Sequence, residues 1–386
     1  MSWIKRFLVL KLTIFLFFFL LSIKVFDFAV GLISDLNDET QDIKKYSTSL
    51  KTDRTLLLKE NLPNLNTVIK PDKKLMLGTQ NLMRKDFVVR TDADGFIIGP
   101  RDFIHAKDKV SIIFFGGSTT ECIHVEEERR FPYLVSLNLN VRVLNGGISG
   151  GHSMHSLLSL IGKGIPYKPN HIILMHAVND LTTLSKTLSY WGEQPEGRSL
   201  IQKESKIVEN VGLYRVARSV KNFLVPNLWL KISHIFQVTA EKTPQDEWAA
   251  LRDRKYKFSD IENAMVDQFT ASLKSFVAVS REWGIEPILM TQFNRVKKDD
   301  LFVREAYERY PQPISYDDFV RLYQKTNGIV RTVAKQEKVF LIDLDTQIPS
   351  TKEYIYDAVH LNTKGSEIVA EKITTALRSR YPSIYK

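Results

Sequence analysis

Cysteine is nearly absent from this chain of 386 residues, because Cys122 is the only one. An intramolecular disulfide is therefore excluded, which neither requires nor forbids an oxidising compartment. Cys122 could act as a thiol nucleophile, but a lone cysteine is usually a small buried hydrophobe. The sequence also lacks a phosphate-binding loop and a dinucleotide fingerprint, so we expect no cofactor.

Nucleic-acid-binding patterns are missing as well. No helix-turn-helix, zinc-finger or RNA-binding motif accompanies the formal net charge of +10. A basic surface without such a motif is more typical of a protein that faces anionic lipid or polysaccharide. We therefore expect no nucleic-acid partner, and the sequence supports no prediction of an oligomeric state.

Charge is almost absent from residues 7–23, FLVLKLTIFLFFFLLSI, in which Lys11 is the only charged residue. This length lies at the short limit of the ~17–25 residues that span a bilayer. Lys5 and Arg6 precede the run, whereas acidic residues follow it, and the positive-inside rule then places the N-terminus in the cytoplasm. A cleaved signal peptide is the alternative, but no A-x-A cleavage pattern follows. We expect residues 1–33 to be a single-pass anchor and the rest to be exported, to the periplasm or the cell exterior.

The remainder divides by composition into a polar stalk at 34–75 and a folded domain at 76–386. Short apolar runs predict five strands, at Val110–Phe115, Val141–Leu144, His171–His176, Ile285–Thr291 and Val339–Asp343. Helix-period patterns lie between and after them, at Ser153–Ile161, Ile261–Trp283, Phe319–Gln336 and Lys364–Arg380. Alternating strands and helices indicate an α/β fold with a parallel sheet, whose site lies beyond the carboxyl ends of the strands.

A long gap separates the third and fourth predicted strands. We interpret residues 185–260 as a helical insertion. Within it, Ser205–Val238 carries basic residues among apolar ones, so it is either a basic amphipathic segment that touches a membrane or lids a site, or a helix packed on the main domain. Pro226 breaks the amphipathic pattern, which favours the packed helix.

Two candidate site stretches are glycine-rich turns that follow predicted strands. In GGS, at 116–118, the glycines permit a sharp turn, and Ser118 could begin a helix with its own N–H unpaired. In NGGISGG, at 145–151, the backbone N–H of Gly150 could point into the same space. Each stretch alone is equally typical of an ordinary capped or flexible turn.

Two further stretches carry polar side chains at loops. Asn179 in AVND, at 177–180, could donate its amide N–H to a developing oxyanion, or simply bond to its own loop. In DAVH, at 357–360, His360 could act as a general base that the carboxylate of Asp357 orients. Asp180 is expected to brace its loop rather than to react.

Taken together and in this order, the four stretches resemble the blocks of the SGNH family, also called GDSL esterases and lipases. The resemblance covers about residues 90–380, without much of 185–260, and departs at Gly117, where Asp is usual, and at Ala177, where Gly is usual. It implies a flavodoxin-like three-layer sandwich with a sheet of five parallel strands. The roles that it implies are Ser118 as nucleophile, His360 as base and Asp357 as its orienting carboxylate. The implied oxyanion hole consists of the backbone N–H groups of Ser118 and Gly150 and the side-chain amide of Asn179.

Two other patterns offer alternative sites. GISGG, at 147–151, fits the nucleophile elbow of α/β-hydrolases and would make Ser149 the nucleophile, but no upstream H-G-G-G motif exists. His152 and His155 have a spacing that could hold zinc, yet no carboxylate or cysteine lies close in sequence, so we expect no metal.

The function that we expect is a membrane-anchored serine esterase that removes O-acyl groups, acetyl first among them, from an envelope carbohydrate or lipid. An O-acyltransferase that uses the same site is the enzymatic alternative. A binding or scaffold module that keeps the fold without turnover is the alternative from another class.

Overall fold

The computed structural model describes residues 15, 19, 21–25, 53–56, 58–100, 109–192, 200–204, 256–310 and 312–385. The chain divides into two compact units, and the larger comprises residues 56–201 and 247–386. Strands β1 (Asp53–Leu56) and β8 (Ile201–Glu204) pair with each other in a two-stranded sheet of their own. Over the described ranges, no helix is long and apolar enough to cross a membrane. The anchor predicted at 7–23 lies mostly outside these ranges, and the segment 205–238 lies wholly outside them.

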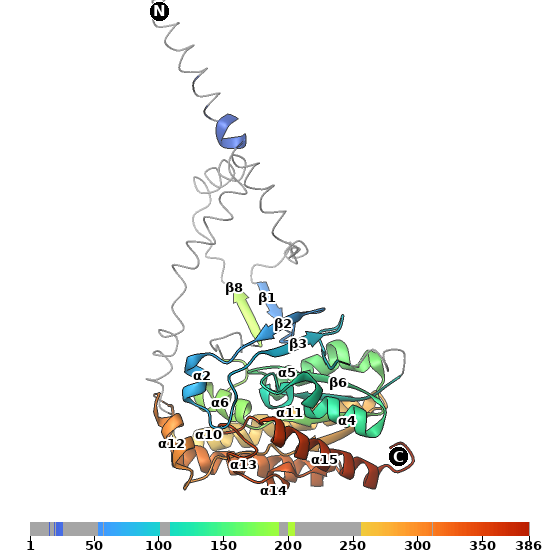
Figure 1. The fold of residues 1–386 in the computed structure, drawn as a ribbon. Helices are drawn as coiled ribbons and strands as arrows, with labels where there is room; N and C mark the ends of the chain where they lie inside the picture. Colours follow the sequence, from blue (N-terminus) through green and yellow to red (C-terminus); the bar gives the residue numbers. More distant parts are fainter. Residues whose placement is uncertain are drawn as a thin grey trace, which may run out of the picture. The chain divides into compact units, whose positions relative to one another are not determined.

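The larger unit is built on the main sheet (Figure 1), whose strand order is β10-β9-β7-β5-β6-β4-β3-β2. Five of its strands are the predicted ones, namely β5 (Val110–Gly116), β6 (Arg142–Gly147), β7 (His171–Met175), β9 (Glu286–Met290) and β10 (Phe340–Ile342). They pair in parallel, and their spatial order β6-β5-β7-β9-β10 is the flavodoxin-like order.

Three antiparallel strands extend the sheet beyond β6, so the sheet is mixed and has eight strands rather than the five parallel strands predicted. They are β2 (Asn66–Ile69), β3 (Phe87–Thr91) and β4 (Ile97–Ile98). Ile97 pairs with Asn145 of β6, and this addition satisfies backbone groups that would otherwise form an open edge. Strand β2 lies within the range 34–75, so part of the segment predicted as a stalk belongs to the sheet.

Helices cover both faces of the sheet because β5 presents large apolar side chains alternately to each. Ile112 and Phe114 pack with α4 (Phe131–Leu139) and α15 (Thr363–Arg380). Ile113 and Phe115 pack against the other helical layer. That layer contains α5 (Ser153–Ser159), α6 (Val178–Thr187), α11 (Thr270–Glu282) and α13 (Tyr316–Gln336). The predicted three-layer arrangement is therefore present.

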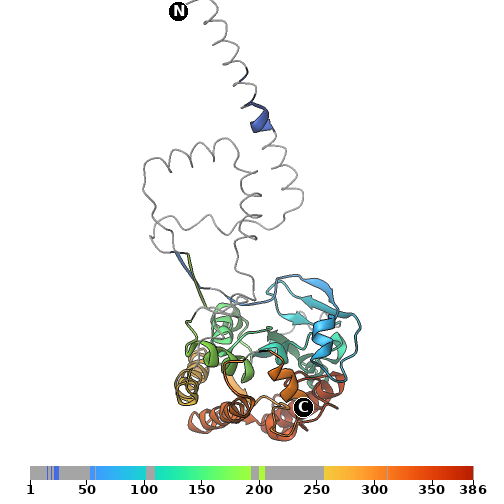
Figure 2. The same cartoon turned by 90° about the vertical axis from the view of Figure 1, so that its left-hand side faces the viewer.

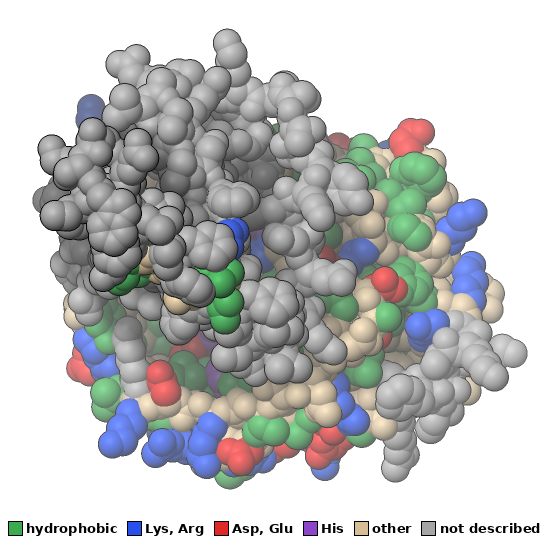
Figure 3. Space-filling view, turned by 90° about the horizontal axis from the view of Figure 1, so that it is seen from above, with side chains coloured by type: hydrophobic (Ala, Val, Ile, Leu, Met, Phe, Trp, Pro, Cys, Tyr) green, Lys and Arg blue, Asp and Glu red, His purple; other side chains and the backbone are tan. Residues whose placement is uncertain are grey.

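Shorter α-helices also occur in the larger unit. They are α2 (Lys73–Leu77), α3 (Ser118–Glu121), α10 (Phe258–Ala264), α12 (Leu301–Glu308) and α14 (Leu344–Gln347). Figures 1 and 2 both place β2 and β3 at one end of the larger unit and the orange and red helices at the other. Seen from above in Figure 3, basic and acidic side chains are interspersed along the visible rim of the described surface.

Candidate active site

Ser118 lies at the carboxyl end of the central strand, where the sequence predicted it. Strand β5 ends at Gly116, Gly117 continues in an extended conformation with φ −86° and ψ −158°, and Ser118 begins α3. The first N–H groups of a helix have no partner within it, so the Ser118 N–H is available to a ligand. The apolar run buries the strand, and the strand thereby carries the serine to the edge of the sheet.

Ser118 Oγ, His360 and Asp357 form one hydrogen-bonded chain. His360 Nε2 lies 2.8 Å from Ser118 Oγ, and His360 Nδ1 lies 2.7 Å from Asp357 Oδ2. Because Nδ1–H donates to the carboxylate, Nε2 is the acceptor that faces the serine hydroxyl. The backbone N–H groups of Val359 and His360 donate to Asp357 Oδ1 over 2.8 and 2.7 Å, which holds the carboxylate in its own loop.

The electrostatics of the pair suit a general base. Burial by itself would lower the pKa of His360, but the charge and the hydrogen bond of Asp357 outweigh it and raise that pKa above 6.5. Burial would raise the pKa of Asp357, whereas His360 and the two backbone N–H groups lower it below 3.8. Asp357 therefore stays ionised at neutral pH, and it stabilises the imidazolium that forms when His360 accepts a proton.

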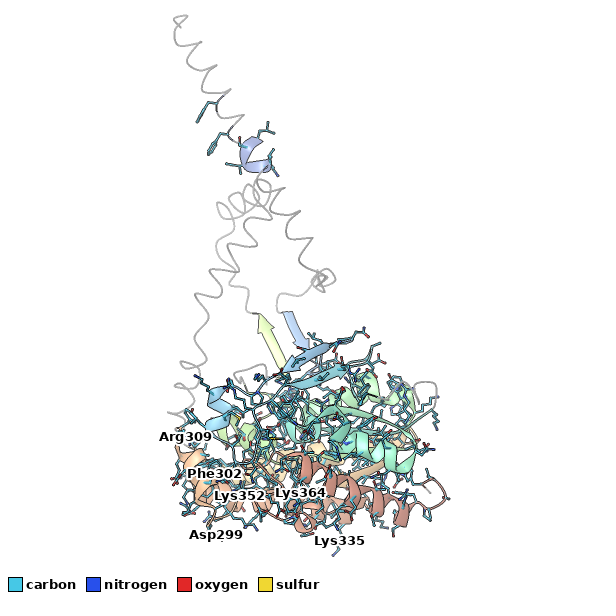
Figure 4. The ribbon with its side chains drawn as sticks, in the orientation of Figure 1. Asp299, Phe302, Arg309, Lys335, Lys352 and Lys364 are labelled. Carbon is cyan, nitrogen blue, oxygen red and sulfur yellow. The ribbon has the colours of Figure 1, made fainter. Side chains whose placement is uncertain are left out.

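The loop that carries this pair is held by Arg295, a residue that the sequence analysis missed. Ile355 and Leu361 bridge the two ends of the loop. The buried Arg295 donates from its backbone N–H to Ala358 O over 2.8 Å and from Nη1 to Ile355 O over 3.1 Å. Its guanidinium lies 5.8 Å from the ring centroid of Phe302, which Figure 4 labels on α12. Arg295 therefore holds the loop that carries Asp357 and His360.

The predicted oxyanion donors converge on the same cavity, whose volume is about 330 Å³ and whose lining includes Ser118, Gly150, Asn179 and His360. Gly150 has φ +69°, a left-handed conformation that favours glycine. The Asn179 side-chain amide donates to Gly151 O over 2.7 Å, so it is fixed beside the Gly150 loop. The structure thus brings together every residue that the sequence assigned to this site.

Gln292 is a second residue that the sequence analysis missed. Its Nε2 donates to Thr119 Oγ1 over 2.7 Å, and its Oε1 accepts from the backbone N–H of Val178 over 2.9 Å and from Tyr323 OH over 2.7 Å. Gln292 therefore ties the helix that begins at Ser118 to the start of the helix that carries Asn179. Its position two residues after the end of β9, at the same sheet edge, is the signal that could have found it.

The alternative nucleophiles, Ser149 and Cys122, also line the cavity, but neither is hydrogen-bonded to a histidine base. Ser149 Oγ donates to Glu121 Oε2 rather than to a histidine. Cys122 is buried, and burial raises the pKa of its thiol to about 12, so it is not a thiolate at neutral pH.

The remaining site candidates are structural. In the described ranges, no group of three His, Cys, Asp or Glu residues could hold a metal ion, and His155 Nδ1 instead accepts from the backbone N–H of His152 over 3.2 Å. Asp180 is fully buried and accepts from Ser153 Oγ and Tyr190 OH, each over 2.5 Å. It braces its loop, as predicted.

Neither a family model nor a curated protein matches this chain. Solved structures do resemble it in fold. One is a GDSL-like lipase from Bacteroides thetaiotaomicron, with 15% identity, a TM-score of 0.39, and coverage of 71% of this chain and 90% of the other. Another is an acetylxylan esterase from Geobacillus stearothermophilus, with 14% identity, a TM-score of 0.37, and coverage of 70% and 95%.

The arrangement at the sheet edge is the one that the resemblance to SGNH hydrolases implied. Ser118, Gly150, Asn179 and His360 follow each other along the chain in the order of that family's blocks, and all four line one cavity.

Proposed function

We propose that the chain is a serine ester hydrolase that removes a short O-acyl group through an acyl-enzyme. The observation that carries this is the 2.8 Å contact between Ser118 Oγ and His360 Nε2 in the cavity that Gly150 and Asn179 also line. A serine hydroxyl is a weak nucleophile until an adjacent base accepts its proton, and this contact supplies that base.

The proposed ester hydrolysis takes place in two half-reactions, acylation of Ser118 and then deacylation. Ser118 Oγ attacks the ester carbonyl as its proton passes to His360 Nε2, and the oxyanion accepts hydrogen bonds from the N–H groups of Ser118 and Gly150 and the amide of Asn179. The intermediate collapses, and His360 returns its proton to the departing alkoxide. Water then attacks the acyl-enzyme as its proton passes to His360 Nε2. The bond between the acyl carbon and Ser118 Oγ breaks, His360 returns the proton to Ser118 Oγ, and the acid is released.

The size of the cavity supports a short acyl group. About 330 Å³ lies at the small end of the ~300–1,000 Å³ range of ligand pockets. The apolar part of its wall comes from Leu75, Ile123, Val178, Val359 and Leu361. Such a wall suits the methyl group of an acetyl ester, and a sugar or lipid alcohol would occupy the open side.

The proposal includes export and anchoring by the N-terminal segment. Its support is the apolar run 7–23 with Lys5 and Arg6 before it. Membrane fractionation, followed by protease treatment of intact cells or spheroplasts, tests this. Full-length protein in the soluble fraction, or a catalytic unit protected by the inner membrane, would contradict it.

The catalytic proposal is tested with the full-length protein and p-nitrophenyl esters of increasing chain length, alongside a fluorophosphonate probe. We expect acetyl ester to be preferred, and we expect both turnover and labelling to be lost in Ser118→Ala. A folded wild-type protein that neither turns over nor labels would favour a binding module. If acetate appears on an added sugar alcohol rather than in solution, the second half-reaction is acyl transfer.

A further inference from the structure

Glu121 carries a buried carboxyl group next to the proposed site. This group takes no part in the proposed reaction. Glu121 is the last residue of the helix that Ser118 begins, and only 3% of its surface is exposed. A carboxyl group in such a place is destabilised unless it has hydrogen-bond partners. Its side-chain hydrogen-bond partner is the hydroxyl of Ser149. Ser149 directly precedes the proposed oxyanion donor Gly150.

Gly150 is held from both sides through its neighbours. On one side Ser149 is bound to Glu121, and on the other Gly151 O accepts from the Asn179 amide over 2.7 Å. The loop starts from a fixed point as well, because the backbone N–H of Ile148 donates to Gly116 O over 3.1 Å. The direction of the Gly150 N–H, at φ +69°, therefore depends on both anchors.

We propose that Glu121 is a positioning residue that aligns the Gly150 N–H of the oxyanion hole by anchoring Ser149. This inference rests on the proposed esterase function. Glu121 acts through the loop and does not touch the substrate. One short helix thereby carries both the nucleophile, at its first residue, and the anchor of the second oxyanion donor, at its last.

The anchor depends on the charge of Glu121, since an ionised acceptor holds the Ser149 hydroxyl more strongly than a neutral one. Burial raises the pKa of Glu121 to about 7, although the Ser149 hydrogen bond and the charges of Arg130 and His360 oppose this. The other titratable groups that interact with it, Cys122 and Tyr356, have pKa values raised by burial and are neutral at pH 7. Glu121 therefore changes its charge near neutral pH.

Two protons then limit activity on the acidic side. The fastest state has an ionised Glu121 and a neutral His360, so log(kcat/KM) should fall with a slope steeper than 1 where Glu121 takes up its proton, until that proton has cost about 10-fold, and with a slope of 1 at lower pH. Glu121→Gln removes one of these requirements and also a negative charge that raises the pKa of His360. Its acid limb should have a slope of 1 and lie at lower pH.

The test compares wild type, Glu121→Gln, Ser149→Ala and the double variant on p-nitrophenyl acetate. We expect each single change to lower kcat about 10-fold with little change in KM, less than the ~10²–10³-fold loss of a donor itself. The double variant should be little worse than either single one, because both break the same link. Glu128→Gln, which removes an exposed carboxylate nearby, is the matched control and should leave kcat and the acid slope unchanged.

Hydrogen exchange gives a readout that does not depend on turnover. Amides of residues 148–151 should exchange faster in Glu121→Gln than in wild type, while peptides from β9 should not change. If wild type is inactive, the esterase proposal fails and exchange still decides whether Glu121 anchors the loop. Unchanged exchange, or wild-type kcat and acid slope in Glu121→Gln, would overturn the inference.

Discussion

Gly117→Ala should inactivate the site without unfolding the protein. A Cβ atom at Gly117 would lie 2.5 Å from the amide nitrogen of Asn179 and 3.2 Å from Gly151 O. Ordinary contacts begin at 3.4 Å, so the Asn179 amide must move by about 0.9 Å. The backbone tolerates alanine, because φ is −86° and no left-handed conformation is involved. The Asn179 side chain therefore occupies the space that a side chain at position 117 would need.

The displacement is large for an oxyanion donor, which must lie within about 2.7–3.1 Å of the developing charge. We expect kcat on p-nitrophenyl acetate to fall about 10²–10³-fold, equivalent to ~3–4 kcal/mol in the barrier, with KM nearly unchanged. Gly117→Asp, which introduces the residue usual in the SGNH family, should be at least as slow. The thermal midpoint should change by only a few degrees, since Gly→Ala also reduces the entropy of the unfolded chain.

A double-variant cycle identifies the cause. In an Asn179→Ala background the obstructing amide is absent, so adding Gly117→Ala should cost little further activity. Gly328→Ala is the control for glycine replacement as such, because a Cβ there meets nothing within 4 Å. Wild-type kcat in Gly117→Ala, or an equal loss in the Asn179→Ala background, would refute the reasoning.

Two further substitutions and one labelling experiment test other parts of the structure. Asp357→Asn removes the charge that raises the pKa of His360, so kcat should fall ~10³–10⁴-fold and the acid limb of kcat/KM should move to lower pH; an acid limb that does not move would contradict this. Arg295→Met breaks the pair with Asp300 and leaves Ile355 O without its donor, and should lower the urea-derived unfolding free energy by about 3 kcal/mol. Arg309→Met, at an exposed arginine labelled in Figure 4, should change it by less than about 0.5 kcal/mol. Iodoacetamide at pH 8 should label Cys122 only after denaturation, since the thiol is buried, and labelling of the folded protein would show an accessible thiol.

Local sequence patterns predicted the central strands and the positions of the site residues. The run VSIIFFG is long, apolar and closed by glycine, and it forms β5 with Ser118 directly beyond it. The same rule places Gly150 and Asn179, because the carboxyl ends of parallel strands share one edge. The strands β2, β3 and β4 were missed because they form by pairing with one another and, through β4, with the edge of β6, rather than by a pattern of their own.

The sequence by itself determined which residue types stand at the strand ends, since apolar runs, glycines and polar side chains are local features. Only the tertiary structure decided which of them meet. Ser118 and His360 are separated by 242 positions and come within 2.8 Å because α15 packs back on the sheet after the catalytic loop. The supporting contacts of Gln292, Arg295 and Glu121 were also decided only by the tertiary structure. Each of these side chains bonds to a distant segment, and no local pattern records such a contact, because it exists only once the chain has packed.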